Sequence, residues 1–251
     1  MHAEHAELIS ALRAENLRLT AQTAEMSVRP IDRSDALPFL KAKHYAARVP
    51  SISYAFGLFR GSALVGVATY GTPPSHTLLK GVAGDARAGI VIELNRLTCE
   101  NSRNCASFLV GRSMRLLPRP TIVVSYADTG AGHVGYVYQA CNFLYTGMSS
   151  PWNDPVVRGL EHQHHATFAH GKTNNEMRKR FGDALGFRQR TRKHRYIYIH
   201  AGKNERKQIR SELRYDILPY PKGDTTRHET REAQVQTFLF GGENEVQMEA
   251  V

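Results

Sequence analysis

The stretch TIVVSYADTGAGHVGYVYQACNFLYTG, residues 121–147, constrains the fold more than any other part of the chain. An apolar run ends at Asp128, a turn with three glycines follows, and the spacing then becomes that of a short helix before a second apolar run. Strand, turn, helix and strand in direct succession are typical of α/β proteins, whose ligands bind at the carboxyl ends of the strands. Asp128 and the glycines after it therefore mark a candidate site.

The elements before this stretch fit the same class of fold. The sequence predicts a strand at 28–31, a helix from Ser34, a hairpin made of 53–60 and 63–74, a strand at 90–99 and a helix at 105–117. We expect a helix at 132–143 and a strand at 143–149 after Asp128. This order is that of the GNAT-like acyltransferase fold, an α/β (α+β) fold with a central mixed sheet flanked by helices.

Four regions follow along the chain. We expect an N-terminal helix at 1–26, a GNAT-like catalytic core at 27–160, a basic DNA-binding extension packed on the core at 161–222, and a polar mobile tail at 223–251. Leu8, Leu12 and Leu19 lie near heptad spacing in the N-terminal helix, which is either a homodimerisation arm or a frayed extension. The pattern loosens after Pro151, until the alternating run YIYIH predicts another strand.

Composition excludes several classes of protein. No run approaches the ~20 apolar residues that a membrane span requires, and the N-terminus lacks the plan of a signal peptide, so we expect a soluble intracellular protein with no membrane partner. The three cysteines, Cys99, Cys105 and Cys141, have no CxxC spacing. They are interpreted as reduced buried thiols, since they form neither a disulfide framework nor a zinc site.

Positive charge is concentrated in one region. The formal net charge is +10 at pH 7, and residues 172–214 alone carry 14 Lys and Arg against 4 Asp and Glu. The dense clusters RKR and RQRTRKHR favour double-stranded DNA as a partner over a merely solvated surface. The predicted DNA contacts are Arg178, Lys179, Arg180, Arg190, Arg192, Lys193 and Arg195.

The run VYQACNF matches a pattern with which GNAT enzymes often end the helix after their fifth strand. Asn142 stands where that pattern has glycine, and Asn also tolerates the left-handed backbone of a helix C-cap. By this resemblance Tyr138 lies near the coenzyme A sulfur and protonates the departing thiolate. The alternative is that Tyr138 is a core aromatic on an amphipathic helix.

The coenzyme loop departs from the GNAT pattern. These enzymes bind the coenzyme A pyrophosphate with the N–H groups of a glycine-rich loop at a helix N-terminus. This chain has ENSRNCAS there, without either glycine, so the backbone of residues 101–106 and the hydroxyl of Ser107 would have to serve. The predicted acetyl-CoA contacts are Leu97, Asn101, Ser102, Arg103, Asn104, Cys105, Ala106, Ser107 and Asn142.

Four blocks in order make the resemblance more specific. KAKHYAARVP, VIELNRLTC, VVSYADTGAGHVGYVYQACNFLYTG and KHRYIYIHAGKNERKQIR together resemble the phage Mom DNA-modification family over about residues 40–210. The resemblance implies conversion of adenine N6 in duplex DNA to a carbamoylmethyl derivative, which protects phage DNA from host restriction in the host cytoplasm. Attack of N6 on a thioester carbonyl would give N6-acetyladenine instead. A redox metal, with iron proposed for the family, would suit the extra step.

The candidate chemical site comes from these blocks. We expect the catalytic residues to be His44, Tyr45, Arg96, Ser125, Asp128 and Tyr138, with His44 and Asp128 as metal ligands. Asp128 accepts a proton from N6, binds a metal or merely caps the next helix, and His44 is a base, a ligand or a structural residue. Arg96 pairs with Glu93 or Asp128, or holds a phosphate. We interpret the cluster of His162, His164, His165 and His170 as a solvated loop.

Two alternative functions stay open. A conventional GNAT acetyltransferase of proteins or small amines predicts an intact glycine-rich loop and no concentrated basic region. A non-catalytic DNA-binding protein on a GNAT scaffold is compatible with the degenerate loop but not favoured by the Tyr138 pattern.

Overall fold

The structure is a computed structural model of the 251-residue chain. It describes Ser10 and residues 25–43, 49–100, 104–163, 165–169, 171–223 and 239–240. The chain divides into two compact units. The first unit comprises residues 1–126, 135–147 and 195–220, and the second comprises 127–134, 148–194 and 221–251. Residues 195–220, which the sequence analysis grouped with the basic extension, thus count with the first unit.

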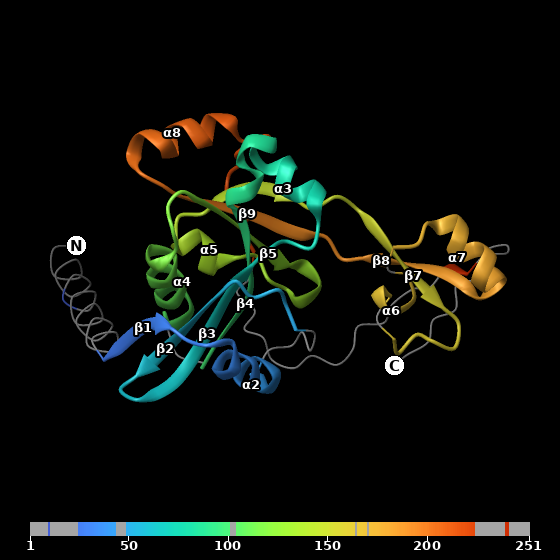
Figure 1. Ribbon diagram of the computed structural model, residues 1–251, viewed down its shortest axis with the longest axis horizontal. Coiled ribbons are helices and arrows are strands. Elements are labelled where there is room, and N and C mark those ends of the chain that lie inside the picture. The colour runs from blue at the N-terminus through green and yellow to red at the C-terminus, as the bar shows by residue number, and fades with distance from the viewer. Residues whose placement is uncertain are drawn as a thin grey trace, which may run out of the picture. The chain divides into compact units, whose positions relative to one another are not determined.

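A seven-stranded sheet is the framework of the first unit (Figure 1). The strands lie in the order β1, β2, β3, β4, β5, β9 and β6. Neighbours from β1 to β4 pair antiparallel, whereas β4 and β5 pair parallel, so the sheet is mixed. Their bounds are β1 (Met26–Pro30), β2 (Tyr54–Arg60), β3 (Ala63–Gly71), β4 (Val91–Cys99), β5 (Thr121–Asp128), β6 (Leu144–Met148) and β9 (Lys193–His200). The ends of β5 and β6 and the start of β9 count with the second unit.

Two helices cover one face of the sheet at β4, β5 and β9. α3 (His76–Ala83) and α8 (Lys203–Glu212) contribute Val82 and Ile209 to a core formed with the alternate residues Ile122 and Val124 of β5. Each of these helices is amphipathic, and α8 is so polar that Ile209 is its one fully buried residue. The burial of Ile209 in this core, which includes Ile197 and Ile199 of β9, therefore attaches α8 to the sheet through a single apolar side chain.

Another pair of helices covers opposite faces of β3. α2 (Arg33–Lys43) packs on Val67, and α4 (Cys105–Leu116) contacts Tyr70, whose hydroxyl lies 2.7 Å from the Ser113 hydroxyl. Val67 and Tyr70 are three residues apart on one strand, so they point to opposite faces. The predicted α/β class, with a central mixed sheet flanked by helices, is confirmed.

β6 is an edge strand of this sheet, and the chain after α8 lies along it. The Leu218 N–H donates to the Tyr145 carbonyl at 2.9 Å, and the Tyr220 hydroxyl donates to the Phe143 carbonyl at 2.7 Å. We call residues 214–220 the edge strap. Their contacts occupy backbone acceptors that an edge strand would otherwise present to solvent.

A smaller sheet organises the second unit. β7 (Trp152–Val157) pairs antiparallel with β8 (Leu185–Arg190), and β10 (Leu239–Phe240) adds two residue pairs to β8. α7 (Asn174–Phe181) begins with a capping box formed by Thr173 and Glu176, and the short helix α6 (Ala166–Ala169) precedes it. The buried core of this unit consists of Val157, Phe168, Met177 and Leu185.

The predicted elements match the observed ones up to residue 148 with two differences. α3 was not predicted, and α5 (Tyr136–Ala140) is shorter than the predicted 132–143 because Gly132 and Gly135 adopt left-handed backbone before it. After Pro151, where the sequence pattern loosens, the structure has β7, α7 and β8, which the sequence did not predict. The predicted N-terminal helix and most of the predicted mobile tail lie outside the described residues. Every described helix is too short or too polar to cross a bilayer.

Candidate functional site

The parallel pairing of β4 and β5 stops after three residue pairs, of which Glu93 with Val124 is the last. Beyond it, the Ser125 hydroxyl donates to the Leu94 carbonyl at 2.9 Å, and Ser125 is fully buried. A side chain thus replaces the backbone ladder where the two strands part. This contact gives Ser125, predicted as a chemical residue, a structural role that the sequence did not indicate.

β4 also carries a bulge at the same place. Thr69 and Tyr70 of β3 face Arg96 and Leu94, which leaves Asn95 as the extra residue. The Asn95 amide accepts from the Thr69 hydroxyl at 2.7 Å and donates to the Ser51 carbonyl at 2.7 Å, and Arg96 Nη1 donates to the Asn95 carbonyl at 2.7 Å. The predicted site residue Arg96 is therefore held directly beside the bulge.

α4 follows β4 and begins within the segment in which the coenzyme loop was predicted. Asn104 at its N-cap adopts left-handed backbone (φ 64°) and makes no side-chain cap hydrogen bond, and the first turn holds no acidic residue. Ser107 donates its hydroxyl to the Asn104 carbonyl at 3.1 Å. The first N–H groups of a helix have no partner within it and its dipole favours anions, so the backbone of residues 105–107 fits a phosphate group.

α5 ends in a Schellman motif that explains the spacing of the VYQACNF pattern. The Phe143 N–H donates to the Tyr138 carbonyl at 3.0 Å, and the Asn142 N–H donates to the Gln139 carbonyl at 3.0 Å. Asn142 has φ 58°, so the predicted left-handed conformation is confirmed. The rings of Tyr138 and Phe143, 5.4 Å apart, make the apolar contact that accompanies this motif.

Tyr138 lies between two aromatic rings. Besides Phe143, it packs on Tyr196 of β9 with ring centroids 5.3 Å apart, and it is half-buried. Burial raises the pKa of Tyr196 to about 12, although the hydrogen bond from the Gln139 amide (3.1 Å) opposes this shift. Gly135 has φ 90°, and a Cβ there would overlap the Tyr196 ring, so this position requires glycine.

Asp128 belongs to the second unit. Its Oδ1 accepts hydrogen bonds from the Gly130 N–H and the Thr191 hydroxyl, both at 2.9 Å, and its Oδ2 lies 3.2 Å from Lys193 Nζ. The carboxylate therefore caps the turn at 129–131, as the capping alternative predicts, and pairs with a predicted DNA contact.

Metal and thiol chemistry have few candidates among the described residues. Within them, no group of three or more His, Cys, Asp or Glu side chains is placed to hold a metal ion. His165 Nε2 lies 3.7 Å from Asp154, His162 is exposed, and His164 and His170 lie outside the described residues. The cysteines are free, and burial raises the pKa of Cys99 to about 12 and that of Cys141 to about 11. These two thiols are therefore protonated at neutral pH.

The predicted DNA contacts fall into two groups. Arg178, Lys179 and Arg180 are exposed in the last turn of α7, where cations also complement the helix dipole. The remaining four make contacts within their own unit. Arg190 binds Asp154 through Nε at 2.9 Å and through Nη2. The Arg192 Nε donates to the Ser149 carbonyl at 2.7 Å, and Lys193 forms an ion pair with Asp128.

Arg195, in the first unit, is the most thoroughly held of these cations. Its Nε donates to the Thr146 hydroxyl at 3.0 Å and its Nη2 to the Thr146 carbonyl at 2.7 Å. Its Cζ lies 3.4 Å from the centroid of Tyr215. Burial raises the pKa of nearby Tyr126, while Arg195 lowers it and Glu93 raises it, so these groups interact near the end of β5.

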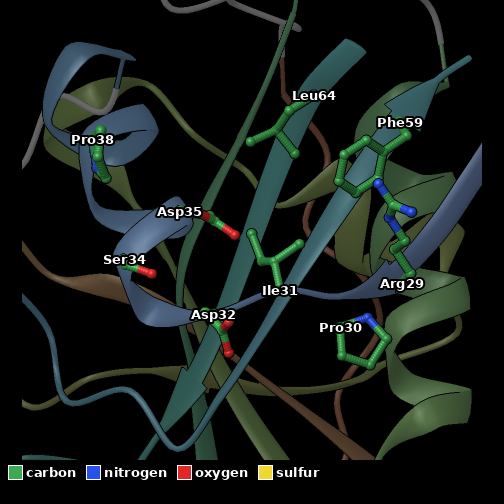
Figure 2. A pocket seen from close by; sticks show the side chains of 9 residues that line it. All are labelled: Arg29, Pro30, Ile31, Asp32, Ser34, Asp35, Pro38, Phe59 and Leu64. Carbon is green, nitrogen blue, oxygen red and sulfur yellow. The ribbon is translucent and has the colours of Figure 1, made fainter. Parts of the chain in front are cut away.

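A pocket of about 710 Å³ lies between the end of β1 and the first turn of α2 (Figure 2). The Arg29 guanidinium lies 4.0 Å from the Phe59 ring centroid on one side, and Asp32, Ser34 and Asp35 lie on the helix side. None of the predicted site residues lines it. This pocket is thus separate from the site that the sequence indicated.

The predicted site residues are divided between the two units. Arg96, Ser125, Tyr138, Asn142 and residues 104–107 all belong to the first unit, whereas Asp128 belongs to the second. Residues 44, 45 and 101–103, which include the predicted His44 and Tyr45, lie outside the described residues. Glu93, at the last pair before β4 and β5 part, is a carboxylate that the predicted site did not include.

Comparison of the sequence with models of known protein families identifies a matching family. The sequence model of the Mom protein family matches residues 25–222. The methylcarbamoylase mom of Escherichia phage Mu is 28% identical over 214 residues, which cover 79% of this chain and 84% of that protein.

Solved structures that resemble the chain are acetyltransferases. Arabidopsis thaliana NAA60 in complex with acetyl-CoA is 12% identical with a TM-score of 0.43, covering 70% of this chain and 99% of that one. A Bacillus subtilis acetyltransferase in complex with CoA is 12% identical with a TM-score of 0.38, covering 70% and 98%. At such scores the likeness carries no argument about substrate.

Proposed function

Because the chain belongs to the Mom protein family, we propose that it is a phage enzyme that modifies adenine N6 in duplex DNA to a carbamoylmethyl derivative. The observation that carries this proposal is the match of the family over residues 25–222, together with the similarity to a protein named methylcarbamoylase. By this proposal the modified base protects phage DNA from host restriction in the host cytoplasm.

Three features of the chain support a transferase that acts on DNA. β4 and β5 part after Glu93, α4 begins without a capping side chain, and α7 carries three exposed cations. Parted parallel strands with a helix N-terminus beside them suit a ligand that carries phosphates, and the cations suit a DNA backbone. We propose DNA as the partner and a homodimer through the N-terminal helix predicted from the sequence as a further association.

Nucleoside mass spectrometry tests the proposal. DNA from cells that express the protein should contain an adenine nucleoside heavier by a carbamoylmethyl group, and cells with an empty vector should contain none. An adenine heavier by an acetyl group would instead favour a conventional GNAT acetyltransferase reaction. Unchanged DNA that nevertheless binds the purified protein would favour a non-catalytic DNA-binding protein.

Acetyl-CoA is the proposed cofactor, and the first turn of α4 fits its pyrophosphate. The N–H groups of Cys105, Ala106 and Ser107 would hold it, and no acidic side chain in that turn opposes an anion. The bound coenzyme supplies an activated acetyl group. Arg96 lies beside the bulge of β4, where it would orient a bound group, whereas the buried Ser125 hydroxyl holds the two strands where they part.

Tyr138 is the proposed proton donor to the departing thiolate. Its ring is fixed between Phe143 and Tyr196, so replacing Tyr138 by Phe removes the hydroxyl and leaves the packing. If the proton transfer is needed, turnover should fall by roughly 10²-fold while the unfolding midpoint stays unchanged. Equal turnover in the variant would leave Tyr138 as a packing residue of the Schellman motif.

Iron does not fit the described residues. They contain no group of three or more His, Cys, Asp or Glu side chains placed to hold a metal ion, and the Asp128 carboxylate already binds Gly130, Thr191 and Lys193. The predicted ligand His44 lies outside the described residues, and the proposed iron site would depend on it. Elemental analysis of the purified protein tests it, with His44→Ala as the variant that should lose the metal.

A further inference from the structure

The face of the first unit's sheet that α3 and α8 cover continues beyond its apolar core. Side chains alternate between the two faces of a strand, so residues an even number of positions apart share a face. Glu93, Tyr126 and Arg195 therefore lie on the same face as the core, and Tyr126 packs against it. Their strands β4, β5 and β9 are neighbours in the sheet. The core residues of these strands on this face are Val91, Ile122, Val124, Ile197 and Ile199.

These three polar residues, which we call the Glu93 cluster, interact electrostatically. Burial raises the pKa of Tyr126, the positive charge of Arg195 lowers it, and the negative charge of Glu93 raises it. Charges have such effects only at short distance, so the carboxylate and the guanidinium both lie near the phenol. The Tyr126 hydroxyl keeps its proton at neutral pH and can donate a hydrogen bond.

Arg195 is the structural member of the Glu93 cluster. It donates two hydrogen bonds to Thr146 and stacks on Tyr215, with 3.4 Å between its Cζ and the ring centroid. The guanidinium is thus fixed within the fold. Glu93 and Tyr126 are both half-buried, and they are the members that can bind a ligand. All these residues belong to the first unit.

The proposed coenzyme site lies on the other face of the same sheet. Leu94, which follows Glu93, pairs with Tyr70, and the Tyr70 hydroxyl contacts Ser113 of α4. The proposed proton donor of α5 packs on the next residue of β9 after the guanidinium, which also points away from the cluster. The cluster and the elements assigned to the coenzyme are therefore on opposite faces.

The parting of β4 and β5 connects these two faces. Pairing between the strands ends at Glu93 and Val124, directly at the Glu93 cluster. The backbone of a continuous sheet separates groups on its two faces, whereas parted strands leave an opening between them. Two substrates that bind on opposite faces can meet there.

The two ligand-binding members of the cluster complement the edge of adenine. Adenine presents the N6 amino group as a donor and the ring atom N1 as an acceptor beside it. A carboxylate only accepts hydrogen bonds, and a protonated phenol can donate one. Enzymes that act on a base outside the duplex read it by hydrogen bonds to this edge. Guanine and thymine have a carbonyl in place of the amino group, so each would set an acceptor against Glu93.

On the basis of the proposed function, we propose that the target adenine binds on the face of the Glu93 cluster. Its N6 amino group donates to the Glu93 carboxylate, and the Tyr126 hydroxyl donates to its N1. Acetyl-CoA binds on the face of α4, and the two substrates meet where β4 and β5 part. Glu93 and Tyr126 thus select adenine as the acceptor.

Base analogues test each hydrogen bond separately. The probe is a labelled duplex of G·C pairs with one target base opposite an abasic site, so that no pairing is lost when this base leaves the stack. The target is adenine, purine, which lacks the amino group, or 1-deazaadenine, which lacks the N1 acceptor. Without coenzyme, the wild-type protein should bind the adenine duplex roughly 10-fold more tightly than either analogue duplex.

Each variant should lose one preference and keep the other. Glu93→Ala should bind adenine and purine alike and still discriminate against 1-deazaadenine. Tyr126→Phe should bind adenine and 1-deazaadenine alike and still discriminate against purine. A structural role would instead weaken binding to all three duplexes by the same factor, and this result overturns the proposal. Preferences in both variants that equal those of the wild type also overturn it.

Tyr215→Phe is the matched control for the loss of a hydroxyl. The Tyr215 hydroxyl lies 3.1 Å from the point that a Cβ on Gly81 of α3 would occupy, so it is directed at that helix. This variant should keep both preferences. If the wild type modifies adenine but binds the three duplexes equally, the assignment of the Glu93 cluster fails and the proposed function stands. If it makes no modified base but shows both preferences, each abolished by its own variant, the proposed function fails and the adenine site stands.

Discussion

The two basic clusters of the chain have similar charge in the sequence but different surroundings in the structure. Arg178, Lys179 and Arg180 are exposed on α7, and no ion pair joins them to an acid within the described part of the chain. In the cluster at 190–195, Arg190 and Lys193 are paired with carboxylates, and Arg192 and Arg195 donate to carbonyl oxygens. We call these the α7 cluster and the β8–β9 cluster.

The difference separates charge that serves the fold from charge that is available to a partner. A guanidinium bound to a buried carboxylate adds little to the field outside the protein, because the pair is neutral. Exposed cations at a helix end keep their full charge and neutralise a phosphate by releasing its counterion. The density of Lys and Arg in a sequence therefore does not measure the positive charge of a surface.

The largest expected effect concerns DNA binding by the α7 cluster. Replacing Arg178, Lys179 and Arg180 by Gln should flatten the dependence of log K on log salt by about 2.7, at about 0.9 per phosphate contact. The loss should be the same for all DNA sequences. Fluorescence anisotropy with a labelled duplex at several salt concentrations measures it.

A neutral exchange in the β8–β9 cluster is the matched control. Arg190→Gln combined with Asp154→Asn removes an ion pair without changing the net charge, so the salt slope should stay that of the wild type. An α7 variant with the wild-type slope, or a double variant with a slope flattened as much, would abolish the distinction between the clusters.

Substitutions in the β8–β9 cluster should lower the stability of the protein more than substitutions in the α7 cluster, which is the reverse of their expected effects on DNA binding. Arg190→Ala removes both guanidinium hydrogen bonds from the buried Asp154 and should lower the free energy of unfolding by about 2 kcal/mol. Arg178→Ala removes an exposed side chain and should change it by less than about 0.5 kcal/mol. Urea denaturation followed by circular dichroism compares the midpoints. Similar midpoints for both variants would contradict the assignment of Arg190 to the fold.

Arg195→Lys sharpens the comparison, because it keeps the charge and removes the planar guanidinium. The hydrogen bonds to Thr146 and the stacking on Tyr215 both depend on that geometry, so stability should fall by about 1 kcal/mol. The salt slope of DNA binding should not change. A flattened slope with unchanged stability would instead place Arg195 on the DNA.

The smallest effect concerns Arg119, whose Nε donates to His200 Nε2 at 3.1 Å. Burial lowers the pKa of His200, and the Arg119 and Arg206 charges lower it further. The folded state thus favours the neutral imidazole, and the unfolded state takes up the proton first as the pH falls below about 6.5. Stability should be complete well above that pH and decline below it, by less than about 1 kcal/mol between pH 7 and 6.

His200→Gln keeps an acceptor for Arg119 and removes the titration. Its midpoint in urea should therefore depend less on pH between 7 and 5 than that of the wild type. His194, whose pKa burial also lowers, is retained in both proteins, so the difference between them isolates His200. Parallel curves would mean that His200 does not titrate in this range.

The sequence predicts the elements up to β6 better than those after it for a physical reason. The strands up to β6 are apolar and bounded by turn residues, so their periodicity is visible. α7 and α8 each bury a single residue, Met177 and Ile209, which is too little for a hydrophobic period to stand out from their charges. The place of β9 between β5 and β6 is a long-range pairing that no local pattern encodes.

The sequence indicated which residues belong to the candidate site but not which contacts each of them makes. Asn142 could be predicted in left-handed conformation, since a helix end restricts the backbone locally. The bond from Ser125 to Leu94 depends on where β4 and β5 part, and the capping role of Asp128 was only one of its alternatives. The Tyr138 pattern was interpreted through chemistry, although the Schellman motif already requires its spacing.

The edge strap has a consequence for association between copies of the protein. An uncovered strand at the margin of a sheet is a template on which another chain can add a strand, and this leads to aggregation. Leu218 and Tyr220 occupy the carbonyls of Tyr145 and Phe143 and so withdraw them from such pairing. A protein whose edge strap is displaced would therefore offer these two carbonyls to a strand of another copy, although the strap itself adds no strand to the sheet.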